Sequence, residues 1–171
     1  MEKIRAMLEA LAKASLTEKL SKEQVKSYFH AIKDYPPELV LSVLSKYSYL
    51  PPINELVKKL EEKRTLLAFE ILQKAIEKAG IYGAVVFEDR KLQVFVKLMG
   101  GWQEICEMSP KELRYWFFRL YPEIEPDGGR EEIFTTEYTL DDAKILRVKP
   151  LSFYLEEKVY RALPGGENGG I

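Results

Sequence analysis

The chain has 171 residues, of which 46% are hydrophobic and 31% are charged, with a formal net charge of −1. This composition is typical of a globular protein with a highly charged surface, and the charge balance excludes a strongly basic nucleic-acid-binding domain, although not a local basic stripe. The single cysteine, Cys106, allows no intramolecular disulfide, which favours a reducing, cytoplasmic setting. No apolar run has the length of a signal peptide or a membrane span, so we expect no contact with a membrane.

Capping residues and double prolines divide the first half of the chain into helices. Apolar residues between these signals repeat at three- and four-residue spacing, as on the buried face of an amphipathic helix. Ser21 and Gln24 have the pattern of a capping box, and proline is favoured in the first turn of a helix. The expected helices are residues 1–14, a segment that starts at Ser21, residues 36–47 and residues 52–79. The charged stretch 58–64 separates two apolar stripes of the last helix and is the expected domain boundary.

The segment from residue 84 to residue 102 combines an apolar run with strong turn signals. Residues 84–87 fit either a short buried extended segment or one turn of helix. Asp89 can cap a helix over residues 90–99, and the glycine pair 100–101 then ends that helix. Trp102 follows at once, and we expect its large side chain to clamp this turn to the helix before it.

The remainder of the chain starts with one more clear helix signal. Ser109 followed by Pro110 places a capping hydroxyl before a proline, so a helix starts here and stops near Pro122. The elements expected after it are a strand over 133–138, a partner strand over 143–148, a helix over 151–163 and a mobile tail.

Taken together, these elements predict a mainly α protein. We expect a helical bundle of two small modules that share a long helix or are joined by one, with a small β-hairpin and a final helix near the C-terminus. The predicted divisions are an N-terminal helical domain over 1–64, a second helical domain over 65–125, a small α/β extension over 126–163 and a disordered tail over 164–171.

Groups for catalysis or for metal binding are sparse. His30 is the single histidine, and Cys106 is the one other soft ligand that a zinc site could use. The glycine pairs lack the lysine and hydroxyl residues of a phosphate-binding loop, so they are interpreted as turns. We therefore predict a non-enzymatic protein with no catalytic residues, no cofactor and no metal.

Aromatic residues are dense in the helix that follows Pro110. They cannot all face inward, because residues 115 and 118 lie on a different face from residues 116 and 120. Either flanking elements bury both faces, or one aromatic face binds a partner. The candidate partner-binding residues are Arg114, Tyr115, Phe118 and Arg119, with Tyr47 and Tyr49 as a second patch. As an alternative, the same face could stack single-stranded nucleic acid, with Lys58, Lys59, Lys63 and Arg64 as a basic stripe.

Two blocks of the sequence resemble phage proteins. Residues 1–60 are similar to the N-terminal helical domain of phage replicative helicase loader/inhibitor proteins, in which a tyrosine-bearing helix leads to a lysine-aspartate-tyrosine-proline turn and a double proline with isoleucine opens the last helix. The matching residues are Tyr28, Ile32 to Pro36, Glu38 to Val40, Tyr47, Leu50 to Ile53, Glu55 and Leu56. Residues 66–121 resemble an uncharacterised phage and prophage domain with a methionine-glycine-glycine-tryptophan signature. Here the matching residues are Ala75-Ile76, Gly80 to Tyr82, Val85 to Asp89 and Met99 to Trp102.

The resemblance implies an accessory protein of mobile-element DNA replication. Loader/inhibitor proteins are not enzymes, and their helical domain supports a contact with a replicative helicase. We therefore expect a protein-binding adaptor whose partner is a replicative helicase or an initiator. The alternatives are the nucleic-acid-binding module described above and an inhibitor of a host system.

Overall fold

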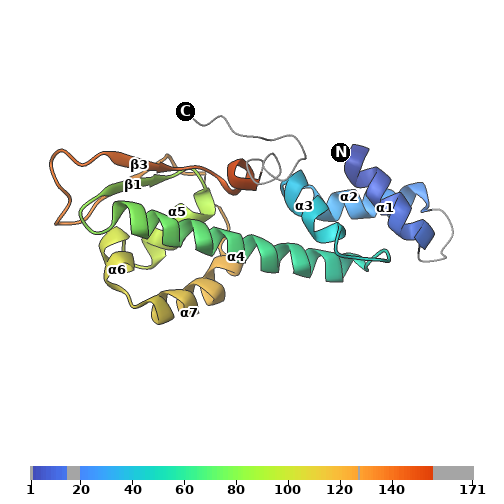
Figure 1. The fold of residues 1–171 in the computed structure, drawn as a ribbon, viewed down its shortest axis with the longest axis horizontal. Coiled ribbons are helices and arrows are strands. Elements are labelled where there is room, and N and C mark those ends of the chain that lie inside the picture. The colour runs from blue at the N-terminus through green and yellow to red at the C-terminus, as the bar shows by residue number, and fades with distance from the viewer. Residues whose placement is uncertain (1, 15–19, 127, 156–171) are drawn as a thin grey trace, which may run out of the picture. The chain divides into compact units, whose positions relative to one another are not determined.

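The computed structural model describes residues 2–14, 20–126 and 128–155 (Figure 1). The described chain divides into two compact units, with the division between Arg64 and Thr65 inside the long helix α4 (Ile53–Ala79). Unit 1 holds the described residues up to Arg64 together with Tyr154 and Leu155, and unit 2 holds residues 65–153. The fold is mainly α with a small three-stranded sheet, as the sequence predicts. Among the described helices, none is both long and apolar enough to cross a membrane.

Unit 1 consists of helices whose starts agree with the sequence signals. These are α1 (Glu2–Ala14), α2 (Lys22–Ile32), α3 (Pro37–Leu44) and the first part of α4. The capping box before α2 is confirmed, because the Ser21 hydroxyl accepts from the amide of Gln24 and the Gln24 side chain accepts from the amide of Ser21. Helix α3 ends at Leu44 and not near Tyr47, because the amides of Lys46 and Tyr47 bond to carbonyls three residues back and tighten the chain into a turn.

Two tyrosine side chains of unit 1 donate hydrogen bonds to groups far along the chain. The buried Tyr28 hydroxyl donates to the carbonyl oxygen of Pro51 at 2.6 Å. Tyr35 donates to the Glu61 carboxylate at 2.7 Å, and burial, followed by this contact, raises the pKa of Tyr35. The fully buried apolar side chains around them include Leu8, Leu39, Val40, Leu44, Leu56 and Leu60.

Unit 2 packs four helices and a 3₁₀ turn around an aromatic core. Its elements are the second part of α4, α5 (Arg90–Leu98), α6 (Trp102–Glu107), α7 (Pro110–Leu120) and η1 (Tyr121–Glu123). Asp89 caps α5 and Ser109 forms a capping box with Glu112 at the start of α7, which confirms both predicted starts. Gly100 and Gly101 take φ values of 93° and 111°, so they end α5 in a backbone conformation that other residues rarely adopt.

The sheet differs from the expected hairpin. Strand β1 (Ala84–Phe87) lies in the centre, with β2 (Ile133–Phe134) antiparallel to it on one side and β3 (Ile145–Val148) parallel to it on the other. All four residues of β1 are buried, and a buried strand needs hydrogen-bond partners on both edges. The two later strands therefore pair with β1 and not with each other, and they belong to the same sheet as β1 although the sequence places them in a separate extension.

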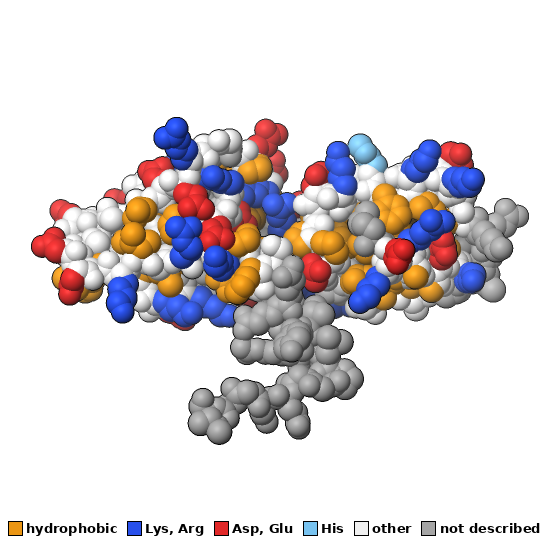
Figure 2. Space-filling model, turned by 90° about the horizontal axis from the view of Figure 1, so that it is seen from above, with side chains coloured by type: hydrophobic (Ala, Val, Ile, Leu, Met, Phe, Trp, Pro, Cys, Tyr) orange, Lys and Arg blue, Asp and Glu red, His pale blue; other side chains and the backbone are white. Residues whose placement is uncertain are grey.

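The outer surface of this sheet carries a network of ion pairs. Arg147 lies 2.9 Å from Glu131 and 3.6 Å from Glu88, and Lys149 lies 2.8 Å from Glu88. Figure 2, which views the molecule from the side where β1 and β3 lie, shows acidic and basic side chains intermixed with apolar ones. Arg147 of β3 and Lys149 directly after it are thus already paired with carboxylates.

Trp102 is a core residue of unit 2 and is 1% exposed. It packs edge-on against Phe87 of β1 and donates a hydrogen bond to the carbonyl of Gly80 after α4. Trp102 therefore contacts β1 and the turn after α4, and not only the preceding helix.

Residues 151–155 are helical, at the start of the predicted helix over 151–163. The rest of that helix and the predicted tail over 164–171 lie outside the described residues.

Candidate functional site

The candidate site is the outer surface of helix α7. Leu113 and Phe117 point into the core, and Phe117 stacks on Tyr121 with ring centroids 4.6 Å apart and an interplanar angle of 14°. This line of buried residues repeats every four positions and leaves the neighbouring side chains at the surface. Tyr115 is 56% exposed and Trp116 is 38% exposed. Leu113, Phe117 and Tyr121 fill the core-facing side of the helix, which leaves Trp116 partly at the surface.

Arg119 holds the two exposed rings of α7 in place. Its Nη1 donates to the Tyr115 hydroxyl at 2.6 Å, and its guanidinium carbon lies 5.9 Å from the Tyr115 ring centroid and 6.0 Å from that of Trp116. The two rings meet edge to face with centroids 5.2 Å apart. Spacings of three and four residues place these side chains together on one helix surface. We call Tyr115, Trp116 and Arg119 the Arg119 cluster.

The Arg119 cluster exposes aromatic surface in a defined geometry. Cation–π contacts and the hydrogen bond restrict the rotamers of its three side chains before any partner arrives. In the part of the chain that the structure describes, Arg119 contacts the two rings and the Tyr115 hydroxyl and pairs with no carboxylate. The guanidinium therefore keeps a positive charge beside two exposed rings, a combination suited to an acidic and apolar partner surface.

The other two predicted residues of α7 form a separate contact. The Arg114 guanidinium carbon lies 4.8 Å from the Phe118 ring centroid and 5.8 Å from that of Phe69 on α4. Phe118 is half-buried, and its ring lies 5.4 Å from Phe69. The structure thus separates the four predicted α7 residues into two pairs, and Phe118 with Arg114 helps to pack α7 against α4.

The second predicted patch lies in unit 1. Tyr47 and Tyr49 meet edge to face with ring centroids 5.7 Å apart. Tyr49 is 46% exposed, whereas Tyr47 is half-buried, and loss of hydration followed by a hydrogen bond with Glu55 raises the pKa of Tyr47. This pair therefore presents one exposed ring, and it lacks the cation that orders the Arg119 cluster.

The predicted basic stripe on α4 consists of Lys58, Lys59, Lys63 and Arg64. Acidic residues interrupt it: Lys59 pairs with Glu62 at 2.8 Å, and Arg64 approaches Glu61 at 3.9 Å. Lys63 donates to the Ser42 hydroxyl of α3 at 2.8 Å, so its charged end lies against α3 within unit 1. These side chains do not form a continuous positive surface along the helix.

His30 and Cys106, the two side chains that a zinc site could use, lie in different units. Cys106 is half-buried on α6, and burial, with a smaller effect of the Glu107 charge, raises the pKa of its thiol to about 11. His30 is exposed on α2. Within residues 2–14, 20–126 and 128–155, no group of three or more histidine, cysteine or acidic side chains could hold a metal ion.

No family model, no curated protein and no solved structure matches this chain.

Proposed function

We propose that the protein is a non-enzymatic, phage or prophage-type accessory protein of DNA replication that acts as a protein-binding adaptor. The Arg119 cluster carries this proposal. Tyrosine, tryptophan and arginine are the residue types that most often supply the binding energy of protein interfaces. Because Tyr115, Trp116 and Arg119 already contact one another, less side-chain entropy is lost when a partner binds.

Charge favours a protein partner over a nucleic acid. Residues 65–153, which include the Arg119 cluster, carry more acidic than basic side chains. The lysines and arginine of α4 are interleaved with carboxylates, and so they offer no extended track for a phosphate backbone. The class of partner comes from the resemblance of residues 1–60 to helicase loader/inhibitor proteins, which points to a replicative helicase or an initiator.

Binding to the purified replicative helicase of the host cell tests this proposal. We expect a complex at micromolar protein in size-exclusion chromatography with light scattering. Trp116→Ala should weaken the complex by about thirtyfold, the effect of removing one strong contact residue. Leu98→Ala is the matched control, because Leu98 is 63% exposed on another helix of the same unit.

Two results would contradict the proposal. One is the absence of a complex, or a complex that Trp116→Ala and Leu98→Ala affect equally. The other is binding of labelled single-stranded DNA that requires Trp116 and weakens steeply with salt, because that behaviour indicates a nucleic-acid-binding module.

A further inference from the structure

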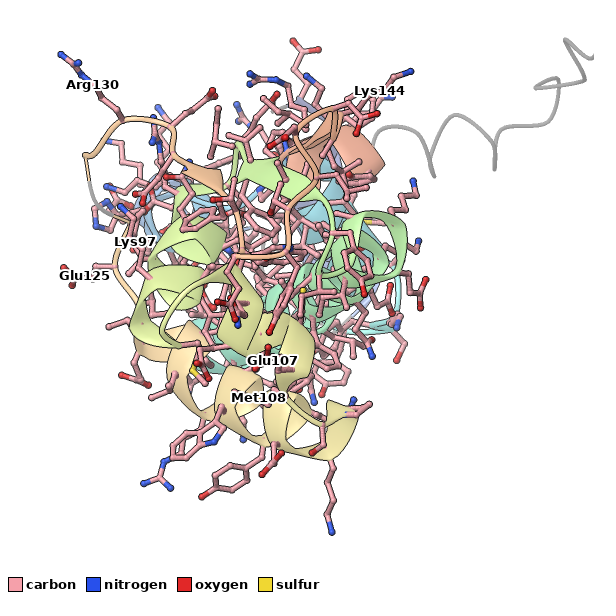
Figure 3. The ribbon with its side chains drawn as sticks, turned by 90° about the vertical axis from the view of Figure 1, so that its left-hand side faces the viewer. Lys97, Glu107, Met108, Glu125, Arg130 and Lys144 are labelled. Atoms are coloured by element: carbon pink, nitrogen blue, oxygen red, sulfur yellow. The ribbon has the colours of Figure 1, made fainter. Side chains whose placement is uncertain are left out.

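A hollow of about 430 Å³ lies beside the start of β3 in unit 2. Its walls come from the end of α4, the turn over residues 80–83 and the segment over residues 140–146. The lining residues that matter below are Lys78, Tyr82, Leu140, Lys144, Ile145 and Leu146. In Figure 3, Lys144 lies on the opposite side of the unit from Met108, which comes just before α7. This hollow is therefore distinct from the Arg119 cluster.

The hollow is lined by apolar side chains that water reaches. Tyr82 is 61% exposed, Leu140 is 58% exposed and Ile145 is 50% exposed. Contiguous apolar surface of this kind is a common mark of a binding site, because its removal from water favours association. An occupant that covers these three residues would therefore gain free energy from apolar contact.

The two turns that form the walls are bonded to each other. The Leu140 amide donates to the carbonyl of Tyr82 at 3.1 Å, and the Thr136 hydroxyl donates to the carbonyl of Ile81 at 2.6 Å. These bonds join segments more than fifty residues apart in the sequence. The hollow is thus preformed, which lowers the entropy cost of filling it.

The hollow continues into an open edge of the sheet. The carbonyl of Val148 accepts from the amide of Glu88, so the main chain of Val148 faces β1. Along a strand the main-chain groups alternate in direction, and hence Ile145 and Arg147 direct their N–H and C=O groups away from β1. The sheet order places β3 at an edge of the described sheet. An extended segment could pair with these groups as an added strand.

Charge indicates the chemistry of such a segment. Lys78 and Lys144 line the hollow and are exposed, and no ion pair involves either of them among the described residues. Arg147, by contrast, is already paired with Glu88 and Glu131. Asp141 and Asp142 lie on the neighbouring turn but do not line the hollow. Two unpaired ammonium groups beside apolar walls complement carboxylates that flank an apolar side chain.

We propose that the edge of β3 binds an extended, acidic segment of a partner protein, which adds a strand to the sheet and places an apolar side chain in the hollow between Tyr82, Leu140 and Ile145. The main-chain groups of Ile145 and Arg147 pair with the segment, and Lys78 and Lys144 contact its carboxylates. This goes beyond the adaptor function proposed above, because it uses a different surface and does not depend on the Arg119 cluster.

Selection from an mRNA-displayed library of random ten-residue peptides on the immobilised full chain tests this proposal. The expected winners alternate apolar residues with aspartate or glutamate and lack a central proline, which cannot donate to a strand ladder. Lys144→Glu should weaken an enriched peptide by about tenfold or more, because it replaces attraction with repulsion. Lys111→Glu, a charge reversal at an exposed lysine of α7, is the matched control and should have little effect.

Amide hydrogen exchange then locates the bound peptide. Strand addition predicts slower exchange of the Ile145 and Arg147 amides, and the same peptide with a proline at its centre should lose this protection. The proposal is overturned if no peptides are enriched, if the enriched peptides are basic, or if they bind without protecting these two amides. It is also overturned if the free chain dimerises through β3 in sedimentation experiments, since a second copy would then be the occupant.

Discussion

The indole Nε1 of Trp102 donates a hydrogen bond to the carbonyl oxygen of Gly80 at 3.0 Å. This bond ties the first residue of α6 to the turn after α4, where Gly80 has a φ of 57°. The Trp102 ring also packs edge-on against Phe87 of β1, with centroids 5.9 Å apart. One side chain therefore connects the long helix, the central strand and the glycine corner at residues 100–101.

Replacing Trp102 should destabilise unit 2 strongly. Trp102→Ala removes a fully buried ring and leaves a cavity, with an expected loss of about 3–5 kcal/mol in the free energy of unfolding. Trp116→Ala removes the other tryptophan, which is partly exposed, and should cost about 1 kcal/mol or less. Urea denaturation followed by tryptophan fluorescence measures both, because each variant keeps one tryptophan in unit 2. Equal effects of the two substitutions would contradict the role assigned to Trp102.

Local capping signals explain why the helix starts could be predicted. A serine or aspartate side chain that accepts from amides in the first turn acts within three or four residues, so Ser21, Asp89 and Ser109 each specify a start without help from the rest of the fold. The sheet depends instead on contacts between distant segments. Nothing in residues 133–148 indicates that they must flank β1, because that need arises from the burial of β1 itself.

The candidate site shows the same difference. The Arg119–Tyr115 bond is a local contact, because side chains four residues apart on a helix lie next to each other. The spacing of the apolar residues does not predict that Trp116 is exposed. Its exposure depends on the tertiary structure, because the buried rings of Phe117 and Tyr121 occupy the space in the core. The hollow beside β3 has no signal in the sequence either, since its walls come from segments about sixty residues apart.

Gly83 should tolerate no side chain. A Cβ at this position would lie 2.5 Å from the carbonyl oxygen of Ala79, a contact with helix backbone that cannot move aside cheaply. We expect Gly83→Ala to lower the free energy of unfolding by about 1–3 kcal/mol, as overpacking does elsewhere. Gly128→Ala is the control, because a Cβ there meets nothing within 4 Å, and it should change stability by less than about 0.5 kcal/mol. Thermal unfolding measured by circular dichroism compares them, and a neutral Gly83→Ala variant would refute the predicted clash.

The Tyr28 hydroxyl and the Pro51 carbonyl form a buried hydrogen bond in unit 1. Tyr28→Phe keeps the ring but leaves the Pro51 carbonyl without this donor, so we expect a loss of about 1–3 kcal/mol. Tyr49→Phe alters a hydroxyl on an exposed ring and should be close to neutral. Urea denaturation followed by far-ultraviolet circular dichroism measures both variants. A silent Tyr28→Phe substitution would show that this hydroxyl does not stabilise the junction between α2 and α4.

The thiol of Cys106 should react slowly at neutral pH. Burial, more than the nearby Glu107 charge, raises the pKa of this thiol to about 11, and the thiolate is the reactive form. Reaction with a disulfide reagent should accelerate as the pH rises toward that value. The same chain in concentrated urea should react much faster at neutral pH, because its thiol regains the ordinary pKa.

The raised pKa of Cys106 also links stability to pH. Between the ordinary pKa of a thiol and about 11, the folded chain binds more protons at Cys106 than the unfolded chain does. The free energy of unfolding should therefore be independent of this group below that window and fall as the pH rises through it. Cys106→Ala should make this part of the pH dependence shallower, whereas Glu107→Gln should shift it only slightly, because burial is the larger cause. A steep fall that persists in Cys106→Ala would assign the pH dependence to another group.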